Sequence, residues 1–346
     1  MDTSLIFTIT EEASSNLPSN VSIGGRLDLF LASAVPGLTR SGAKNLIEKG
    51  KALVNGRTVK AGYALKKGDR VSAELPGEKH GVASPEGLHP RQDIALNIIY
   101  EDDDIIVIDK PSGLAVHPGA GRSSGTLVNA LLNHTKNLSD IYPERPGIVH
   151  RLDMDTTGVL VIAKNNASHE SLAMQFKGHT TARRYQALAW GAFREDEGVI
   201  ALPIGRAVAH RKKMSTRTRK GRTAVTRWKV LRRYPGLTLV ELMPETGRTH
   251  QLRVHLSAIN HPVVGDQVYG GKGAARGQLC PPQALPRRIV DRLRGVKRQL
   301  LHAGTLGIRH PSTGAYMEFS SPLPDDMDEL VKLMDEACSQ SGKKTA

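Results

Sequence analysis

The sequence is poor in cysteine and has no long hydrophobic run, and each shortage excludes a class of protein. Its two cysteines, Cys280 and Cys338, lie far apart and match no metal-ligand spacing, so we expect free thiols in a reducing compartment. No stretch approaches the roughly 18 apolar residues of a membrane-spanning helix. Residues 1–12 lack a basic patch followed by an apolar run, the mark of a signal peptide. We therefore expect a cytoplasmic protein with no membrane partner.

Aromatic side chains are also scarce, at 4% of 346 residues, whereas basic ones are abundant. Lys and Arg total 48 against 34 Asp and Glu, a formal net charge of +14. Such an excess serves general solubility in some proteins, but it also attracts polyanions. An anionic membrane surface is the weaker alternative, because the chain has no long basic amphipathic helix. We expect a nucleic-acid partner recognised through phosphates and shape rather than through extensive base stacking.

The N-terminal part of the chain predicts a flexible arm and then a small α-β unit. Residues 1–20 have little periodicity, and we expect them to be loose. Within residues 21–76, one apolar helix face from Leu27 to Val35 precedes a second short helix that stops at Gly50. Asn55-Gly56 predicts a type I′ hairpin turn leading into Thr58-Val59, and a strand covers residues 70–75. The two helices carry a cluster of cations that is either a solvated face or a contact for a phosphate backbone: Arg40, Lys44, Lys49 and Lys51.

The rest of the chain predicts one larger domain. Residues 77–93 are rich in Gly, Pro, His and Ser and predict a linker. Residues 94–335 show runs of strands with scattered helices and no regular βαβ alternation, which favours an α+β fold around a sheet. Residues 272–299 are Pro- and Arg-rich and predict a mobile insertion, and residues 336–346 predict a flexible tail.

Three segments of this domain hold charged residues that a core does not require. Asp109-Lys110-Pro111 follows a buried strand, an ordinary way for a strand to leave a core. Residues 147–158 contain His150-Arg151-Leu152-Asp153 beside a core strand, where unpaired charges are costly to bury. A local turn explains the residues from Asp155 to Gly158, but it leaves Asp153 and its neighbours unexplained.

The third segment, residues 245–255, contains Arg248 in a loop and Thr249 as the predicted N-cap of a helix over residues 249–259. Its histidines suggest zinc, but no cysteine or carboxylate joins them at metal spacing, so we expect no metal site. A separate basic run, which includes Arg211, Lys212 and Lys213, is either a solvated hairpin or an arm that grips phosphates.

Together, these segments resemble the RluA-type pseudouridine synthases. The hallmark of that family is the run His-Arg-Leu-Asp-x-x-Thr-(Ser/Thr)-Gly, found here at residues 150–158. Residues 21–75 separately resemble the S4-type RNA-binding module, and this pairing is most similar to the RluD branch, which modifies an intersubunit-bridge hairpin of 23S rRNA. Further matches follow in the family's order: Lys110-Pro111, Arg184-Tyr185-x-Ala187, Thr246-Gly247-Arg248-Thr249-His250-Gln251, His261-Pro262-x-x-Gly265-Asp266 and Leu301-His302-Ala303.

The resemblance implies a pseudouridine synthase fold with a mainly antiparallel mixed sheet, and a role for each matching residue. Asp153 is the implied catalytic carboxylate, which either adds to C1′ or relays a proton from the ribose. Arg248 is implied to pair with it, Tyr185 to lie against the target base, and Arg151 to fill the gap that a flipped base leaves. For Lys110 we expect loop shaping or a phosphate contact. The isomerisation needs no cofactor.

Two other functions remain open at this point. A synthase of the same type acting on tRNA fits the charge equally well. A non-catalytic RNA-binding factor in ribosome assembly fits the basic N-terminal unit alone. We expect a monomer that acts on specific uridines in structured RNA, most simply large-subunit rRNA.

Overall fold

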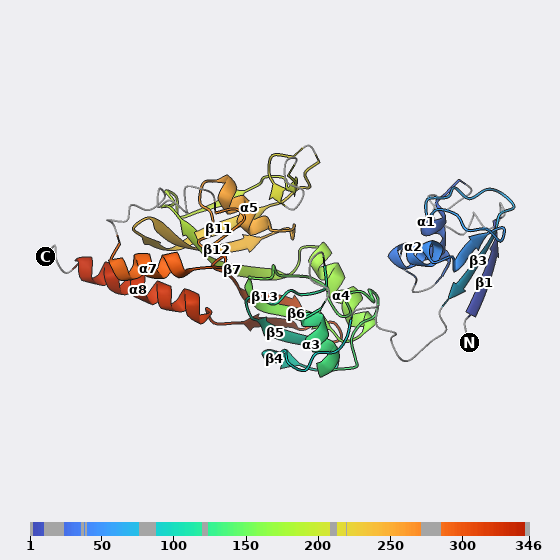
Figure 1. Cartoon of the computed structure of the whole chain (residues 1–346), viewed down its shortest axis with the longest axis horizontal. Helices are drawn as coiled ribbons and strands as arrows, with labels where there is room; N and C mark the ends of the chain where they lie inside the picture. Colours follow the sequence, from blue (N-terminus) through green and yellow to red (C-terminus); the bar gives the residue numbers. More distant parts are fainter. Residues whose placement is uncertain are drawn as a thin grey trace. The chain divides into compact units, whose positions relative to one another are not determined.

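The computed structural model describes residues 3–9, 24–35, 38, 40–75, 88–119, 124–207, 213–218, 220–270 and 285–342 (Figure 1). The chain forms two compact units, Met1–Ala83 and Ser84–Ala346. Among the described residues, no helix is both long and apolar enough to cross a membrane.

The smaller unit packs two helices against a three-stranded sheet with the order β1-β3-β2. The apolar face expected from Leu27 is buried, with Leu27 and Leu31 fully enclosed. Asn55 and Gly56 both have positive φ angles, 53° and 74°, as a type I′ turn requires. The chain does not return as a strand at Thr58-Val59; β2 pairs with β3 instead. The elements are β1 (Thr3–Thr8), α1 (Leu27–Ala34), α2 (Arg40–Glu48), β2 (Ala52–Val54) and β3 (Arg70–Leu75).

The N-terminal residues contain the strand β1, so the prediction of a loose arm over residues 1–20 is wrong for Thr3–Thr8. This strand pairs antiparallel with β3 along its whole length, from Thr3 opposite Leu75 to Thr8 opposite Arg70. Phe7 packs edge-on against Phe30, with ring centroids 5.5 Å apart, while Ile6 points outward. Residues 10–23 lie outside the described part of the chain.

The larger unit is built on a nine-stranded sheet with the order β4-β5-β6-β13-β7-β12-β11-β8, and β14 pairs with β13. All of its strand pairs are antiparallel except β6 with β13, which confirms the mixed, mainly antiparallel α+β sheet. A separate two-stranded ribbon pairs β9 with β10. The strands are β4 (Ile98–Glu101), β5 (Ile105–Lys110), β6 (Thr157–Ala163), β7 (Ala182–Trp190), β8 (Glu197–Ile200), β9 (Gly205–Arg206), β10 (Met214–Ser215), β11 (Thr226–Tyr234), β12 (Leu237–Pro244), β13 (Leu301–Arg309) and β14 (Tyr316–Ser320).

Helices cover this sheet and bury its apolar side chains. Leu131 of α3 (Leu127–His134) packs with Ile106 of β5 and Leu160 of β6. Leu172 of α4 (Asn166–Lys177) packs with Val107, the next residue of β5. Since successive strand residues point to opposite faces, the two helices lie on opposite sides of β5 and β6. The helices are α3 (Leu127–His134), α4 (Asn166–Lys177), α5 (Gln251–Ala258), α7 (Arg287–Gly295) and α8 (Asp325–Gly342).

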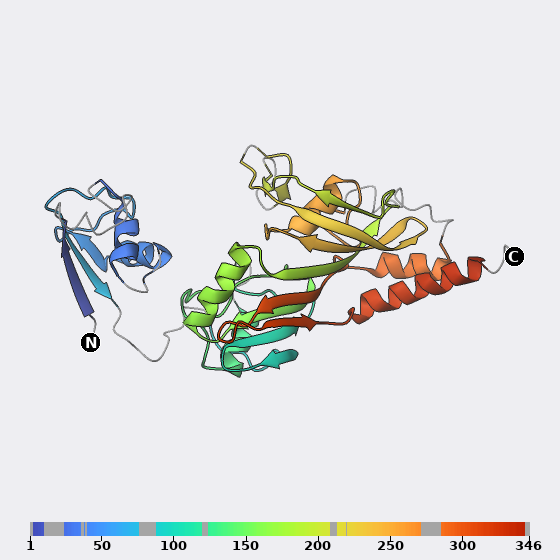
Figure 2. The same ribbon diagram turned by 180° about the vertical axis from the view of Figure 1, so that it is seen from behind.

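The last two helices, α7 and α8, lie side by side, as Figures 1 and 2 both show. Their presence means that two predictions about the C-terminal part of the chain are wrong in part. The expected mobile insertion is wrong for Arg287–Gly295, which form α7 with Ile289 fully buried against α8. The expected flexible tail is wrong up to Gly342, because α8 continues to that residue. Asp335 near its end accepts a hydrogen bond from the Tyr234 hydroxyl at 2.8 Å. Residues 271–284 and 343–346 lie outside the described ranges.

The predicted linker over residues 77–93 is wrong from Leu88 onward. Leu88 is 3% exposed and belongs to the core around Ile106 and Leu127. The next carbonyl, that of His89, accepts a hydrogen bond from the Asn129 side chain at 2.8 Å. These residues are therefore part of the larger unit.

Candidate active site

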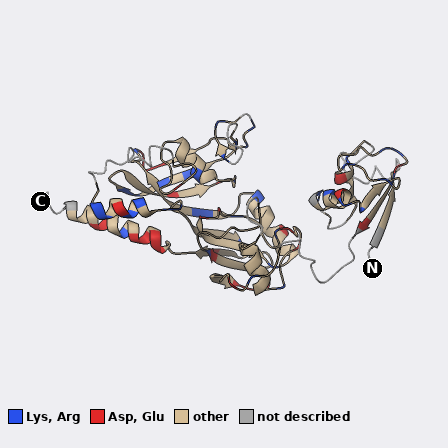
Figure 3. Cartoon of the chain, viewed as in Figure 1, with Lys and Arg blue, Asp and Glu red and all other residues tan. Residues whose placement is uncertain are grey.

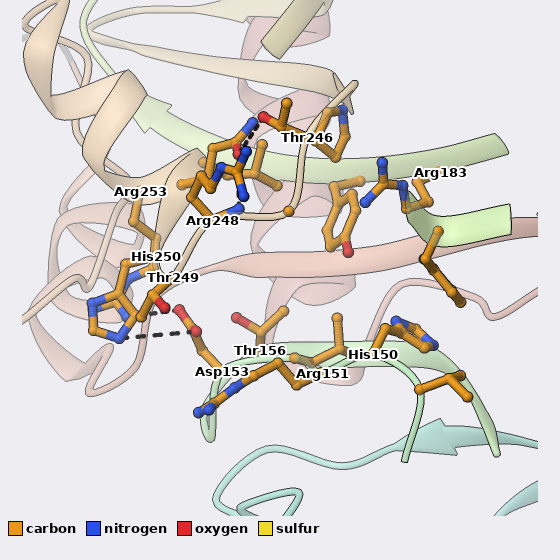
Figure 4. Close-up of a pocket in the computed structure, with 18 of the residues that line it drawn as sticks. His150, Arg151, Asp153, Thr156, Arg183, Thr246, Arg248, Thr249, His250 and Arg253 are labelled. Atoms are coloured by element: carbon orange, nitrogen blue, oxygen red, sulfur yellow. Dashed lines mark hydrogen bonds and ion pairs between the residues drawn. The ribbon is translucent and has the colours of Figure 1, made fainter. Parts of the chain in front are cut away.

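A cavity of about 500 Å³ in the larger unit brings together four of the residues that the sequence singled out (Figure 4). The loop before β6 supplies Arg151 and Asp153, β7 supplies Tyr185, and the segment before α5 supplies Arg248. These residues lie up to about a hundred positions apart in the chain, so it is the sheet that assembles them.

The loop that carries Asp153 is held in place on both sides of that residue. Lys110 Nζ donates to the carbonyl of Met154 at 2.8 Å, and Arg298 Nη1 donates to the carbonyl of Asp155 at 3.1 Å. Gly158 ends the loop with a φ of 113°, and a Cβ there would lie 2.2 Å from the Ala303 carbonyl oxygen. Only glycine therefore allows β6 to pair with β13 at this point.

Lys110 is buried, which corrects its assignment as an RNA-binding residue. Its side chain has 0% exposure and donates to three carbonyls, those of Pro111, Leu114 and Met154, at 2.7, 2.9 and 2.8 Å. Burial lowers the pKa of this lysine to about 8, against the opposing charge of nearby aspartates. A phosphate cannot reach this amine, so Lys110 shapes the loop rather than contacting RNA.

The arginine that pairs with Asp153 is Arg253, on α5. Its Nη1 lies 2.8 Å from Asp153 Oδ2, while its Nε and Nη2 bind both oxygens of Asp266 at 2.7 and 2.9 Å. The Asp266 side chain is fully buried and also accepts two backbone N–H bonds. Burial alone would raise the pKa of Asp266, but the contacts with Arg253 outweigh it and lower that pKa. One arginine thus bridges a buried carboxylate and a cavity-facing one.

The expected pairing of Arg248 with Asp153 is wrong. Arg248 Nε donates to the Thr223 carbonyl at 3.1 Å, and its backbone N–H donates to Gln251 Oε1 at 3.0 Å. The helix begins two residues later than expected, at Gln251, with His250 rather than Thr249 as its N-cap. Arg248 therefore lies in the turn before the helix and bonds the Thr223 carbonyl instead of the carboxylate.

A signal for Arg253 is present in the sequence. In the sequence, Arg253 stands between the apolar residues Leu252 and Val254 inside the predicted helix, and in the structure the first six residues of α5 are all buried. An arginine inside such a helix is buried, and a buried cation requires carboxylate partners. Asp266, in the segment that the family pattern also contains, is the natural candidate.

Tyr185 and His150 take different roles at the cavity wall. Tyr185 packs between two core clusters, and burial raises the pKa of its hydroxyl, which therefore stays protonated at neutral pH. His150 Nε2 accepts the Val161 N–H at 3.1 Å, and its ring stacks on Phe176 at 4.3 Å. Burial lowers the pKa of His150 to about 3. His150 is thus a neutral structural residue, while Arg151 is exposed at the cavity.

The cations predicted to bind RNA in the smaller unit lie on or beside α2 (Figure 3). Arg40 donates to Asp28 at 3.0 Å, and Lys44 lies 3.5 Å from Glu48. Lys49 is exposed and Lys51 is half-buried. In the larger unit, exposed Lys213 donates to the Val268 carbonyl at 3.0 Å. Arg211 and Lys212 lie outside the described residues.

The histidines that suggested zinc are hydrogen-bonded to protein groups. His255 bonds Thr226 Oγ1 and the Leu202 carbonyl, both at 2.9 Å, and His261 bonds the Trp190 carbonyl at 2.9 Å. Elsewhere in the described chain, Asp102, Asp104 and His310 lie close together. Asp102 already accepts from His310 and from the backbone of Asp104, so these contacts give the cluster a structural role.

Comparison with known proteins places the chain in a family. The RNA pseudouridylate synthase family model matches residues 104–258, and the S4 domain model matches residues 25–71. The uncharacterized RNA pseudouridine synthase YlyB of Bacillus subtilis is 43% identical over 89% of this chain and 93% of its own length. Ribosomal large subunit pseudouridine synthase D of Pseudomonas aeruginosa is 42% identical over 90% of this chain and 92% of its own length.

Solved structures agree with this placement. The structure of human RNA pseudouridylate synthase domain containing 4 is 28% identical and superposes with a TM-score of 0.52. It covers 69% of this chain and 93% of the human one. The chain belongs to the RNA pseudouridine synthase family, whose members isomerise uridine to pseudouridine, and carries an N-terminal S4 domain.

Proposed function

We propose that this enzyme isomerises specific uridines of large-subunit ribosomal RNA, with Asp153 as the catalytic carboxylate. The proposal rests mainly on how the Asp153 carboxylate is held and exposed. Arg253 holds one of its oxygens at 2.8 Å, while the side chain remains 18% exposed at the wall of the cavity. The relatives named ribosomal large subunit pseudouridine synthase D support the choice of RNA, at 42% and 40% identity over nine-tenths of the chain.

The reaction sets what the site must do. The bond between N1 and C1′ breaks, the base turns, and C5 joins C1′. C5 then loses its proton and N1 gains one, so no atom or electron is gained or lost overall. The target base must first leave its stack, which costs a few kcal/mol, and a cavity of about 500 Å³ is large enough to hold it. Asp153 then acts at the ribose, either by adding to C1′ or by taking a proton.

The surrounding residues fix this carboxylate and the base. Arg253 holds Asp153 through Oδ2 and leaves Oδ1 without a bond from that arginine, at the wall of the cavity. Tyr185 offers a ring and a protonated hydroxyl to the flipped base. Exposed Arg151 fills the space that the base vacates. The cations of the S4 domain add affinity through RNA phosphates. An rRNA substrate places the enzyme in the cytoplasm, where we expect it to act as a monomer.

Mapping pseudouridines in a deletion strain tests this function. We expect specific sites in large-subunit rRNA to lose modification, wild-type enzyme to restore them, and Asp153→Asn to restore none. Loss confined to tRNA would favour the tRNA alternative. Normal pseudouridine content in every RNA would favour a non-catalytic assembly factor.

A further inference from the structure

A chain of hydrogen bonds leads from β10 to the catalytic cavity through Tyr269 and His250. The backbone N–H of Met214 donates to the Tyr269 hydroxyl at 2.9 Å, and that hydroxyl lies 2.8 Å from His250 Nδ1. On the other side of the imidazole, Nε2 lies 3.9 Å from Asp153 Oδ1. Figure 4 shows the ring of His250 beside Asp153.

This chain determines which nitrogen of His250 carries the proton. Burial raises the pKa of Tyr269, so its hydroxyl is protonated and has one hydrogen to donate. It already accepts the Met214 N–H, and among the described residues the acceptor that it meets is His250 Nδ1. Burial lowers the pKa of His250, which keeps the ring neutral. The tautomer with Nδ1 as the acceptor places the N–H on Nε2, facing Asp153. The nearby carboxylate, itself an acceptor, favours the same tautomer.

The backbone of His250 is held in an unusual conformation. Its φ of 56° lies in the left-handed region, which is strained for a residue other than glycine. His250 occupies the N-cap position of α5, yet its side chain makes no capping hydrogen bond. Strained residues of this kind concentrate at functional sites. The ring of His250 is therefore free of a capping role and lies beside Asp153.

The gap between His250 and Asp153 fits one kind of chemical group. A separation of 3.9 Å is too long for a direct hydrogen bond. A single oxygen about 2.8 Å from both Nε2 and Oδ1 closes a triangle over that gap. Such an oxygen accepts from the N–H and donates to the carboxylate, as a hydroxyl or a water molecule does. Within an RNA chain the 2′-hydroxyl of the ribose is the group with both capacities, and it sits next to C1′.

We propose that His250 is a further catalytic residue, which binds the 2′-hydroxyl of the target uridine together with Asp153. The contact holds C1′ against the carboxylate and selects ribose over deoxyribose at that nucleotide. Tyr269 is a positioning residue, because it acts through the tautomer of His250. The inference rests on the proposed role of Asp153 at the ribose.

Two variants of His250 separate the N–H from the rest of the side chain. His250→Asn tolerates the left-handed backbone, but its amide is too short to reach the position of Nε2. His250→Gln is long enough to place an amide N–H there. The probe is a synthetic RNA hairpin centred on the uridine that loses modification in the deletion strain. It is made in two forms, with ribose or 2′-deoxyribose at that one nucleotide.

Single-turnover rates on the ribose hairpin give the first result. We expect His250→Asn to lower the rate about 10²-fold, the usual effect of removing one donor at a reacting centre, and His250→Gln to recover most of it. Tyr269→Phe should cause a smaller loss. An unchanged rate in His250→Asn would overturn the proposal, and thermal unfolding of each variant checks that it is folded.

The second measurement is the affinity of His250 variants for each hairpin. It uses protein that also carries Asp153→Asn, because neither hairpin should react with that protein during the binding measurement. We expect His250→Asn to weaken binding of the ribose hairpin about tenfold and to leave the deoxyribose hairpin unchanged. Equal weakening of both hairpins, or of neither, would contradict a contact with the 2′-hydroxyl. Turnover of the ribose hairpin by Asp153→Asn itself would instead refute the proposed function, so the two failures are distinguishable.

Discussion

The two units of this protein each contain an aspartate bound by arginine, but the roles of the two charges are reversed. In the S4 unit, Asp28 is 3% exposed and holds Arg26 and Arg40, whose side chains are 48% and 58% exposed. In the larger unit, Arg253 is 7% exposed and holds Asp153, which is 18% exposed. A buried acid presents cations in one unit, and a buried cation presents an acid in the other.

In both units the buried member of the ion pair holds its partner in place, and the more exposed member is available to a ligand. Every polar side-chain atom of the buried partner is hydrogen-bonded. Both oxygens of Asp28 accept from Arg26 or Arg40, and each side-chain nitrogen of Arg253 donates to Asp153 or Asp266. The more exposed partner keeps free capacity for a ligand. Exposed arginines suit the phosphates of RNA, whereas a partly exposed carboxylate suits chemistry at a ribose.

Replacing Arg253 should have the largest effect on the fold. Arg253→Met leaves the fully buried Asp266 carboxylate without its partner, so we expect the free energy of unfolding to fall by about 3–5 kcal/mol and pseudouridine formation to be lost. Denaturant unfolding and a single-turnover assay measure the two effects. Arg253→Lys, which keeps the charge but not the fork, is the matched control and should be intermediate. A loss of stability no larger than that of an exposed pair would contradict the supporting role of Arg253.

Replacing Arg248 sharpens the comparison from the other side. Since Arg248 bonds a carbonyl and not Asp153, Arg248→Ala should lower the single-turnover rate by no more than about tenfold, the value of one hydrogen bond of roughly 1.5 kcal/mol. In the same assay, Arg248→Ala should lower the rate less than Arg253→Lys does. A larger loss of rate in Arg248→Ala would instead support a pairing of Arg248 with Asp153, as the sequence predicted.

In the S4 unit, loss of a presented cation should affect RNA and not the fold. Arg40→Ala leaves Asp28 with both of its bonds to Arg26, so we expect unfolding to change by less than about 1 kcal/mol. RNA affinity should fall, and the slope of log affinity against log salt should become shallower by about 1. Filter binding at several salt concentrations measures this slope. An unchanged slope would indicate that Arg40 does not contact a phosphate.

The effect confined to the narrowest range of conditions is the pH dependence that Asp28 contributes to the free energy of unfolding. Hydrogen bonds from Arg26, helped by Arg40, lower the pKa of Asp28 from 3.8 to about 2, against the effect of burial. Because this pKa is lowered by folding, the stabilisation is complete above about pH 4 and is lost as the pH falls toward 2. Asp28→Asn should flatten the stability curve in that window alone. A variant curve parallel to that of the wild type would refute the assignment.

Local patterns predicted much of the fold, because their signals lie within a few residues. The helix face from Leu27 to Leu31, the Asn55-Gly56 turn and the apolar strand β6 are all of this kind. The strand β1 was missed because its partner, β3, lies more than sixty residues away. Helices α7 and the end of α8 were missed because each depends on the other for its buried face.

The candidate site was predictable in its members but not in its pairing. Family motifs brought Asp153, Tyr185 and Arg151 to one cavity. Arg248 was the one partner expected for Asp153, and Arg253 was not considered. The left-handed N-cap His250 is not visible in a helix pattern. For Lys110 the structure supports the expected loop shaping and not the phosphate contact, because the side chain is buried.

The most direct test of the account is the activity of purified Asp153→Asn on the rRNA hairpin that carries the target uridine. The amide keeps the shape of the side chain but removes its charge. The account predicts that this variant binds the hairpin as tightly as the wild type, to within a few-fold, and forms no pseudouridine in a single-turnover assay. Pseudouridine formation at the wild-type rate would show that the carboxylate held by Arg253 is not the catalytic group.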